Sequence, residues 1–300
     1  MILIFLLYAF LASTFAIGKA ALAFIPPFFL VGIRMTFSGA VLLGFYKLTH
    51  KGPISIPRKD LWLLALLTFF HIYLAYACEF WALQYIASAK VALFYNFSPF
   101  FTALIAYFFI DERLNALQWL GMIIGFVGLL PLLLPVVRDS MWSFFFLDAS
   151  ELVMLAGVVS AVIGWILFKK LGAIYSPLLI NGIAMLFGGV LSLLTAIGTE
   201  STLLMVPKGY TAIQAAGTAS MYVIALIIIA NLVFYNLYGY LLKQYSATLL
   251  SFAGFMTPLF TVFFGWMLNR EYISMYFFWS FLLVSIGLAL FYWQELKYRK

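Results

Sequence analysis

The stretch from residue 98 to residue 112, SPFFTALIAYFFIDE, decides how the whole chain is interpreted. A proline stands second, an apolar run interrupted by one threonine follows, and two acidic residues end the stretch. A soluble helix of this length would carry a polar face, and this one has none. The stretch therefore predicts a segment that crosses the hydrocarbon layer of a membrane, with the acids at its exit.

The composition extends this interpretation to the whole chain. Of the 300 residues, 66% are hydrophobic and only 9% are charged, whereas about a quarter of a typical soluble domain is charged. The apolar runs are continuous rather than alternating, which favours helices and excludes a β-barrel. We expect an all-α integral membrane protein.

Ten apolar runs have the length of membrane spans, which need about 20 residues each. They lie at 2–24, 27–47, 61–83, 88–110, 115–136, 150–168, 173–197, 217–240, 246–268 and 273–294. No separating loop is long enough for a soluble domain, so the chemistry is expected at membrane depth.

From Tyr76 to Gly128, the first half of the chain is repeated in the second half at one constant offset, with no gap needed. The offset pairs Tyr76 with Tyr235, Pro99 with Pro258, Phe101 with Phe260, Thr102 with Thr261 and Glu112 with Glu271. Each half holds five spans, and an odd number forces the second copy to enter the membrane from the opposite side. We expect two inverted five-helix repeats, at residues 1–137 and 149–300, an architecture typical of secondary transporters.

The basic residues predict the orientation. With the N-terminus inside, eleven of the 17 Lys and Arg residues fall in cytoplasmic segments, four fall outside and two lie within spans. This bias predicts an inner (plasma) membrane protein with both termini in the cytoplasm. The basic residues do not cluster on a soluble face, so nucleic acid is not expected as a partner.

The segment 82–128, ALQYIASAKVALFYNFSPFFTALIAYFFIDERLNALQWLGMIIGFVG, resembles the signature region of the drug/metabolite transporter superfamily, EamA-like branch. STFAIGKAAL (13–22) and Arg34 after IPPFFLVGI also fit, whereas NREYI departs from the Glu-Arg-Leu turn in the second half. The resemblance implies ten helices, transport of small organic solutes, and a cavity built from helices 1–4 and 6–9. In GMIIGFVG, the glycines favour close packing of the fifth helix against a neighbour or a second subunit.

Lys19, Arg34 and Glu79 lie well inside spans, where a charge is costly unless it is paired or faces water. Lys19, Arg34 and Glu79 are each predicted within roughly 10 Å of the outer surface, at about 1.5 Å per helical residue, so they could meet. Glu79 is a candidate for substrate or proton binding, and a zwitterionic substrate could share it with Lys19 or Arg34. The alternative for the two basic residues is a salt-bridge cluster or contact with lipid headgroups.

His71 stands eight residues before Glu79, so the two share roughly one side of the third helix. It is either a proton relay or a hydrogen-bonded packing residue. No metal site is expected from one cysteine and two distant histidines.

Aromatic and amide side chains complete the candidate substrate site, because aromatic walls with few polar groups suit a small organic ligand. The candidates are Tyr76, Tyr95, Asn96, Trp165, Asn181, Asn231 and Tyr235. Pro99 and Pro258 are predicted to bend helices 4 and 9 as hinges, with the hydroxyls of Ser98 or Thr102 satisfying freed backbone groups. Glu112 and Glu271 are expected to tie their turns to neighbouring helix ends.

These features predict a carrier that works by alternating access, coupled to protons or to exchange. Amino-acid-like solutes come first as substrates; nucleobases or an adenosyl cofactor such as S-adenosylmethionine are the alternative. The alternatives from other classes of protein are a channel and a membrane enzyme that modifies lipids. We expect no enzymatic activity and no cofactor. The expected partners are the small-molecule substrate and membrane lipid, and the protein is expected to be a monomer or a homodimer.

Overall fold

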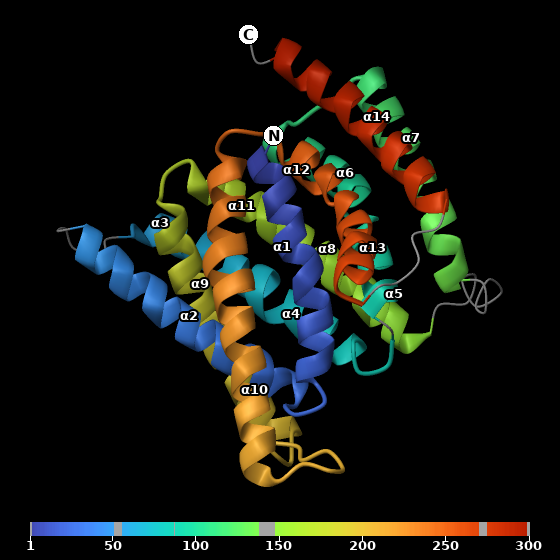
Figure 1. Cartoon of the computed structure of the whole chain (residues 1–300). Coiled ribbons are helices and arrows are strands. Elements are labelled where there is room, and N and C mark those ends of the chain that lie inside the picture. The colour runs from blue at the N-terminus through green and yellow to red at the C-terminus, as the bar shows by residue number, and fades with distance from the viewer. Residues whose placement is uncertain (1, 51–55, 87, 138–147, 270–274, 299–300) are drawn as a thin grey trace.

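The computed structural model describes residues 2–50, 56–86, 88–137, 148–269 and 275–298 (Figure 1). Every regular element in these ranges is a helix. The first half holds α1 (Ile2–Ala21), α2 (Pro27–Thr49), α3 (Arg58–Leu67), α4 (Ala75–Ala82), α5 (Ser88–Tyr95), α6 (Ser98–Ile110) and α7 (Ala116–Val137). The second half holds α8 (Ala149–Gly172), α9 (Pro177–Thr199), α10 (Ala212–Leu226), α11 (Tyr235–Leu242), α12 (Ala247–Ala253), α13 (Met256–Asn269) and α14 (Met275–Tyr298).

The membrane spans of the described chain fall where the sequence predicts them. Eight helical segments are long and apolar enough to cross a membrane, and two shorter apolar segments, Ala116–Pro131 and Ala247–Phe263, take the remaining predicted places. The start of α1 and the end of α14 lie toward the same end of the molecule (Figure 1), as an even number of spans requires. The predicted all-α membrane fold is confirmed.

Helices α2 and α9 pack against each other through equivalent glycines. A Cβ atom on Gly39 would lie 2.3 Å from the backbone nitrogen of Leu186, and one on Gly189 would lie 2.4 Å from that of Thr36. The shift in residue number that takes Gly39 to Gly189 also takes Thr36 to Leu186, so the two contacts are equivalent. This shift is smaller than the one that takes Tyr76 to Tyr235, so the second helix of the repeat needs a gap in the alignment. As the residue number rises along α2, the partner's number falls along α9, so the helices run antiparallel. Equivalent helices in opposite directions are the arrangement that an inverted repeat produces.

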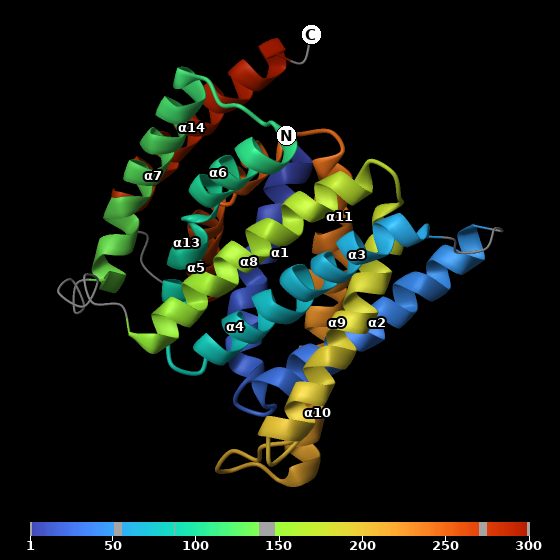
Figure 2. The ribbon, with the colours of Figure 1, turned by 180° about the vertical axis from the view of Figure 1, so that it is seen from behind.

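Helices α7 and α14 form a pair at the edge of the molecule in both views (Figures 1 and 2). A Cβ atom on Gly121 would lie 2.7 Å from the carbonyl oxygen of Gly287. The glycines of the fifth helix therefore serve close packing against a neighbour within the chain, which was one of the two expectations.

Helices 4 and 9 are broken as the prolines predict, but slightly earlier in the chain. The first break, at residues 96–97, separates α5 from α6, and the second, at 254–255, separates α12 from α13. Pro99 then occupies the first turn of α6, where its missing N–H costs nothing. The hydroxyls of Ser98 and Thr102 bond the Ser251 side chain rather than freed backbone groups, in contrast to the expectation.

Two π-helical segments were not expected. Thr68–Leu74 separates α3 from α4, and Ile227–Phe234 separates α10 from α11. Their first residues are related by the same offset as Tyr76 and Tyr235, and each segment ends just before one of these tyrosines. A π turn changes the direction in which the following side chains point, and such turns are frequent at functional sites.

Acidic side chains cap helices that begin beside them. The Glu112 carboxylate accepts hydrogen bonds from the backbone N–H groups of Ala247 and Thr248 at 3.1 and 2.9 Å, and from Lys169 Nζ at 3.2 Å. These contacts satisfy donors at the start of α12 that have no partner within the helix. The expectation that Glu112 ties its turn to a neighbouring helix is confirmed. Glu271 lies outside the described residues.

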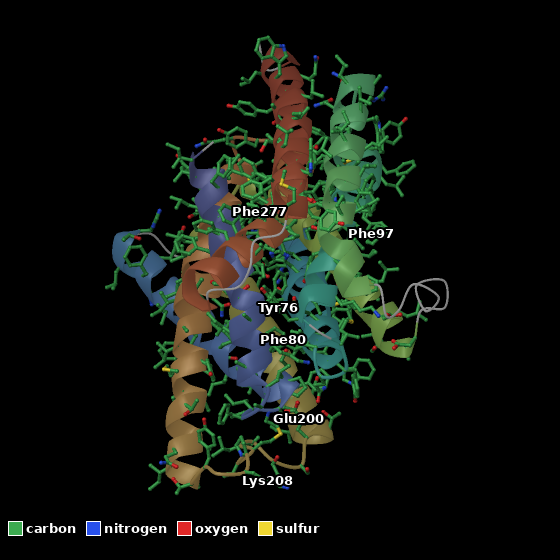
Figure 3. The ribbon with its side chains drawn as sticks, turned by 45° about the vertical axis from the view of Figure 1, so that its right-hand side comes forward. Tyr76, Phe80, Phe97, Glu200, Lys208 and Phe277 are labelled. Carbon is green, nitrogen blue, oxygen red and sulfur yellow. The ribbon has the colours of Figure 1, made fainter. Side chains whose placement is uncertain are left out.

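Glu200 has the same task at the opposite end of the molecule (Figure 3). It accepts hydrogen bonds from the backbone N–H groups of Phe28 and Phe29 at 2.7 and 2.9 Å, at the start of α2. Burial raises the pKa of the Glu200 carboxyl, and the two N–H groups oppose the shift. The loop after α9 is thereby fixed to the helix that carries Arg34.

Replacing Gly39 by leucine should lower the melting temperature of the purified protein, because the added side chain would collide with the α9 backbone. Overpacking of this kind costs about 1–3 kcal/mol or more. Gly44→Leu is the matched control on the same helix, since a Cβ atom there meets nothing within 4 Å. Equal melting temperatures for the two variants would contradict the close α2–α9 approach.

Candidate functional site

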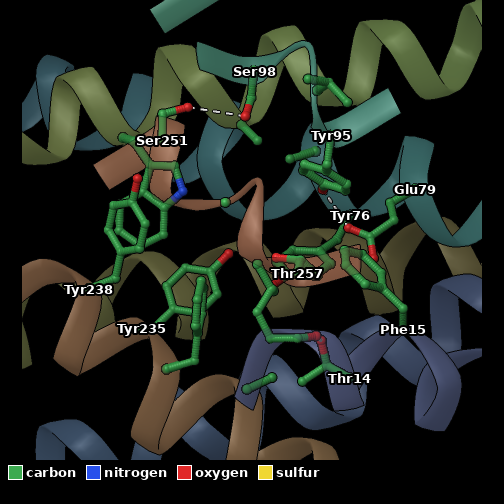
Figure 4. A pocket seen from close by; sticks show the side chains of 18 of the residues that line it. Thr14, Phe15, Tyr76, Glu79, Tyr95, Ser98, Tyr235, Tyr238, Ser251 and Thr257 are labelled. Atoms are coloured by element: carbon green, nitrogen blue, oxygen red, sulfur yellow. Dashed lines mark hydrogen bonds between the residues drawn. The ribbon is translucent and has the colours of Figure 1, made fainter. Parts of the chain in front are cut away.

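A cavity of about 100 Å³ lies where helices of both halves meet (Figure 4). Seven of the predicted site residues line it: Arg34, Tyr76, Glu79, Tyr95, Asn96, Trp165 and Tyr235. Lys19, His71 and Asn231 are not among its lining residues. Side chains from α1, α2, α4, α8, α11 and α12 all reach it, so each half contributes to one site.

Glu79 provides the negative charge of the cavity. Its side chain comes from α4 just after the first π-helical segment, and the residue is only 6% exposed. The Tyr95 hydroxyl donates a hydrogen bond to a Glu79 carboxylate oxygen at 2.7 Å, and Figure 4 shows the two side chains together. No Lys or Arg side chain among the described residues comes within 4.0 Å of the Glu79 carboxylate to pair with it. A buried carboxylate with one neutral partner suits a cationic ligand group.

Arg34 provides the positive charge and is 1% exposed. Its guanidinium carbon lies 4.5 Å from the centre of the Tyr76 ring and 4.7 Å from that of Phe80, so the cation is held by aromatic faces. Figure 3 places both rings in the middle of the molecule. Arg34 forms no ion pair with Glu79 in the described chain.

Lys19 does not join these two charges. Its ammonium group donates hydrogen bonds to the carbonyl oxygens of Leu83 and Ile86, the latter at 3.1 Å. These carbonyls end α4 and the turn after it, where a helix leaves acceptors unsatisfied and favours a cation. Of the three charges that the sequence places near one another, the structure brings only Arg34 and Glu79 to the cavity.

An aromatic wall forms another side of the cavity. Trp165 stacks on Tyr238 with ring centres 3.9 Å apart and lies 5.2 Å from Tyr235. The repeat pair Tyr76 and Tyr235 faces each other across 6.2 Å. Tyr238, the repeat equivalent of Glu79, was not singled out as a site residue from the sequence. The one indication in the sequence is that Tyr238 occupies the position in the second repeat that Glu79 occupies in the first.

His71 lies behind this wall. It is 1% exposed, and its ring centre lies 4.2 Å from that of Trp165 and 5.1 Å from that of Tyr235. Neither ring nitrogen has a hydrogen-bond partner among the described residues. His71 lies within the π-helical segment Thr68–Leu74, and Glu79 lies after it in α4. The expectation that both share one side of the helix assumes a regular α-helix, and only Glu79 lines the cavity.

The buried asparagines have different surroundings. Asn96 lines the cavity, and its side-chain nitrogen has no partner among the described residues. Asn231 instead donates hydrogen bonds to the Arg34 carbonyl oxygen at 3.1 Å and to Ser38 Oγ at 2.9 Å. Asn181 donates to Asn236 Oδ1 at 3.1 Å. Asn231 therefore positions the backbone of Arg34 rather than facing the cavity.

Three hydroxyl groups that line the cavity link the two broken helices. Thr102 on α6 bonds Ser251 on α12, and Ser251 bonds Ser98, each at 3.1 Å; Figure 4 shows the latter contact. Ser251 was not predicted as a site residue, since a single serine in an apolar run has no distinguishing signal. In the described residues, no three His, Cys, Asp or Glu side chains form a set that could hold a metal ion.

Comparison with known proteins gives a consistent family. The model of the EamA-like transporter family matches residues 1–134 and 149–293. A Chlamydia trachomatis protein named S-adenosylmethionine/S-adenosylhomocysteine transporter is 33% identical over 303 residues, covering 98% of this chain and 89% of that protein. A Chlamydia muridarum protein of the same name is 32% identical, covering 98% and 92%.

A solved crystal structure of another protein superposes with a TM-score of 0.71 at 19% identity. The match covers 98% of this chain and 97% of that one. This likeness concerns the fold alone.

Asn231→Ala should destabilise the protein, because it removes two buried hydrogen bonds and leaves the Arg34 carbonyl with fewer donors. The expected cost is about 1–3 kcal/mol, measured by thermal melting in detergent. Asn96→Ala is the matched control, since the Asn96 side-chain nitrogen has no partner to lose among the described residues. A larger loss in Asn96→Ala than in Asn231→Ala would contradict the positions of these two side chains.

Proposed function

Since the chain belongs to the EamA-like transporter family, we propose that it carries S-adenosylmethionine and its demethylated product across the membrane. The chain is a multi-pass membrane protein, and its relatives include proteins named as transporters of a small metabolite. The observation that supports S-adenosylmethionine as the substrate is the similarity, over nearly the whole chain, to proteins named S-adenosylmethionine/S-adenosylhomocysteine transporter. This similarity favours an adenosyl cofactor as the substrate over the amino-acid-like solutes that the sequence places first.

The chemistry of the cavity supports this substrate class. S-adenosylmethionine has a sulfonium cation, an ammonium group and a flat adenine ring. Glu79 offers a buried negative charge without a cationic partner within 4.0 Å in the described chain. Trp165, Tyr235 and Tyr76 offer ring faces, which attract cations and stack on flat bases. We assign these four residues to the substrate site.

Alternating access is the proposed mechanism, with residues 1–137 and 149–300 as the two inverted units. The broken helices α5–α6 and α12–α13 would bend, with Pro99 and Pro258 close to the bends. The hydroxyl chain Thr102–Ser251–Ser98 joins these helices and would have to open when they separate. Its bonds are neutral and easily replaced by water, which suits a contact that forms and breaks in each cycle.

Exchange is the proposed energy source, because a substrate and its demethylated product could bind the same cavity in turn. The proposed orientation has both termini in the cytoplasm of a plasma membrane. Coupling to protons through Glu79 or His71 is the alternative, and an imposed pH gradient separates the two.

In proteoliposomes, uptake of labelled S-adenosylmethionine should rise severalfold when S-adenosylhomocysteine is loaded inside. Absence of uptake under either gradient would contradict the proposed function. Uptake that responds neither to substrate inside nor to a pH gradient would favour a channel.

Glu79→Gln should weaken binding of S-adenosylmethionine about 10- to 100-fold, the range for a lost hydrogen bond to a charged group. The reason is that both cationic groups of the ligand lose their anionic partner. Tyr95→Phe is the matched control: it keeps the carboxylate and removes only the hydroxyl that orients it, so a smaller loss is expected. Calorimetric titration of each purified variant measures both. Unchanged affinity in Glu79→Gln would remove this carboxylate from the site.

A further inference from the structure

One edge of the Arg34 guanidinium has no partner in the described chain. The atoms without a hydrogen bond are Nε and Nη2, which lie side by side on the same edge of the planar group. Arg34 is 1% exposed, so bulk water does not replace the missing partners. Buried donors of a charged group that remain unsatisfied are costly. Such an edge needs an acceptor that the described residues do not supply.

The surroundings of Arg34 hold the group in place and leave this edge without a hydrogen bond among the described residues. The rings of Tyr76 and Phe80 cover the guanidinium, 4.5 and 4.7 Å from its central carbon. The backbone of the residue is fixed as well, because its carbonyl oxygen accepts hydrogen bonds from Ser38 and Asn231. Arg34 also lines the cavity. A rigidly held donor pair next to a cavity is what a binding site for an acceptor requires.

The chemistry of the donor pair identifies the acceptor. Adjacent N–H groups of arginine match the two oxygens of a carboxylate or phosphate in a bidentate contact. The Glu79 carboxylate lines the same cavity, and its charge disfavours a phosphate dianion more than a single carboxylate. A ligand that has a carboxylate next to a cationic group would satisfy the Arg34 donor pair and also suit the negative charge of Glu79. The α-amino-acid group has this arrangement.

We infer that the Nε–Nη2 edge of Arg34 binds the carboxylate of the substrate's amino-acid end, with the substrate ammonium directed to Glu79. This inference deepens the proposed function and rests on it for the identity of the substrate. It also gives the ligand a direction in the cavity. The amino-acid end lies between Arg34 and Glu79, and the adenosine end lies along the wall of Trp165, Tyr235 and Tyr238.

Removing the carboxylate from the ligand tests the inference without changing the protein. Decarboxylated S-adenosylmethionine keeps the sulfonium, the amine and the adenosine and lacks only the carboxylate. The purified full-length wild type should bind S-adenosylmethionine about 10- to 100-fold more tightly than this analogue, measured by calorimetry. Equal affinities would overturn the carboxylate site and leave the proposed function standing. If neither compound nor S-adenosylhomocysteine binds, the proposed function fails, and the inference fails with it.

Two variants then assign the preference to Arg34. Arg34→Gln should abolish the difference between the two ligands, and Arg34→Lys should lose most of it, because lysine keeps the charge without the paired donors. Arg113→Lys is the control: Arg113 also lies over a ring, that of Tyr107, but its side chain is 70% exposed and it does not line the cavity. A preference that persists in both Arg34 variants would overturn the assignment. If these variants do not fold, the comparison in the wild type decides alone.

Discussion

A charge buried at membrane depth is tolerated only where something compensates it, and two such charges define this cavity. Arg34 and Glu79 both line the cavity, and neither forms an ion pair in the described chain. Aromatic faces hold the guanidinium, and one tyrosine hydroxyl holds the carboxylate. These partners are weaker than opposite charges. The compensation is incomplete without a ligand, and a ligand with both signs of charge would complete it.

The scaffold that presents these charges is symmetric, while the site itself is not. Helices α2 and α9 cross through equivalent glycines, and both halves have a broken helix and a π-helical segment at corresponding places. Yet the repeat equivalent of Glu79 is Tyr238, and that of Arg34, by the correspondence of α2 with α9, is Ala184. Charges come from the first half, and the second half adds much of the aromatic wall. Under the proposed alternating access, two similar halves would exchange conformations around a binding site that has one direction.

The sequence predicted the features that follow from composition and spacing. Long apolar runs predicted the spans, the constant offset between the halves predicted the pairing of Tyr76 with Tyr235, and acids at helix ends predicted the capping role of Glu112. The sequence did not predict features that depend on which backbone and side-chain groups form hydrogen bonds. The π-helical segments have no distinct composition, so the different directions of His71 and Glu79 could not be foreseen. Lys19 and Asn231 bond backbone carbonyls instead of facing the cavity, a choice that only tertiary contacts decide.

The melting temperature of the double variant Arg34→Met/Glu79→Gln, with and without S-adenosylmethionine, tests most directly whether these two buried charges exist to bind the ligand. Replacing buried charges by neutral groups of similar volume is often neutral or stabilising, by about 1–4 kcal/mol. If the two charges do so, the ligand-free double variant will melt at the wild-type temperature or above it, and the ligand will no longer raise this temperature. A variant that melts well below the wild type and still responds to the ligand would contradict this role of the two charges.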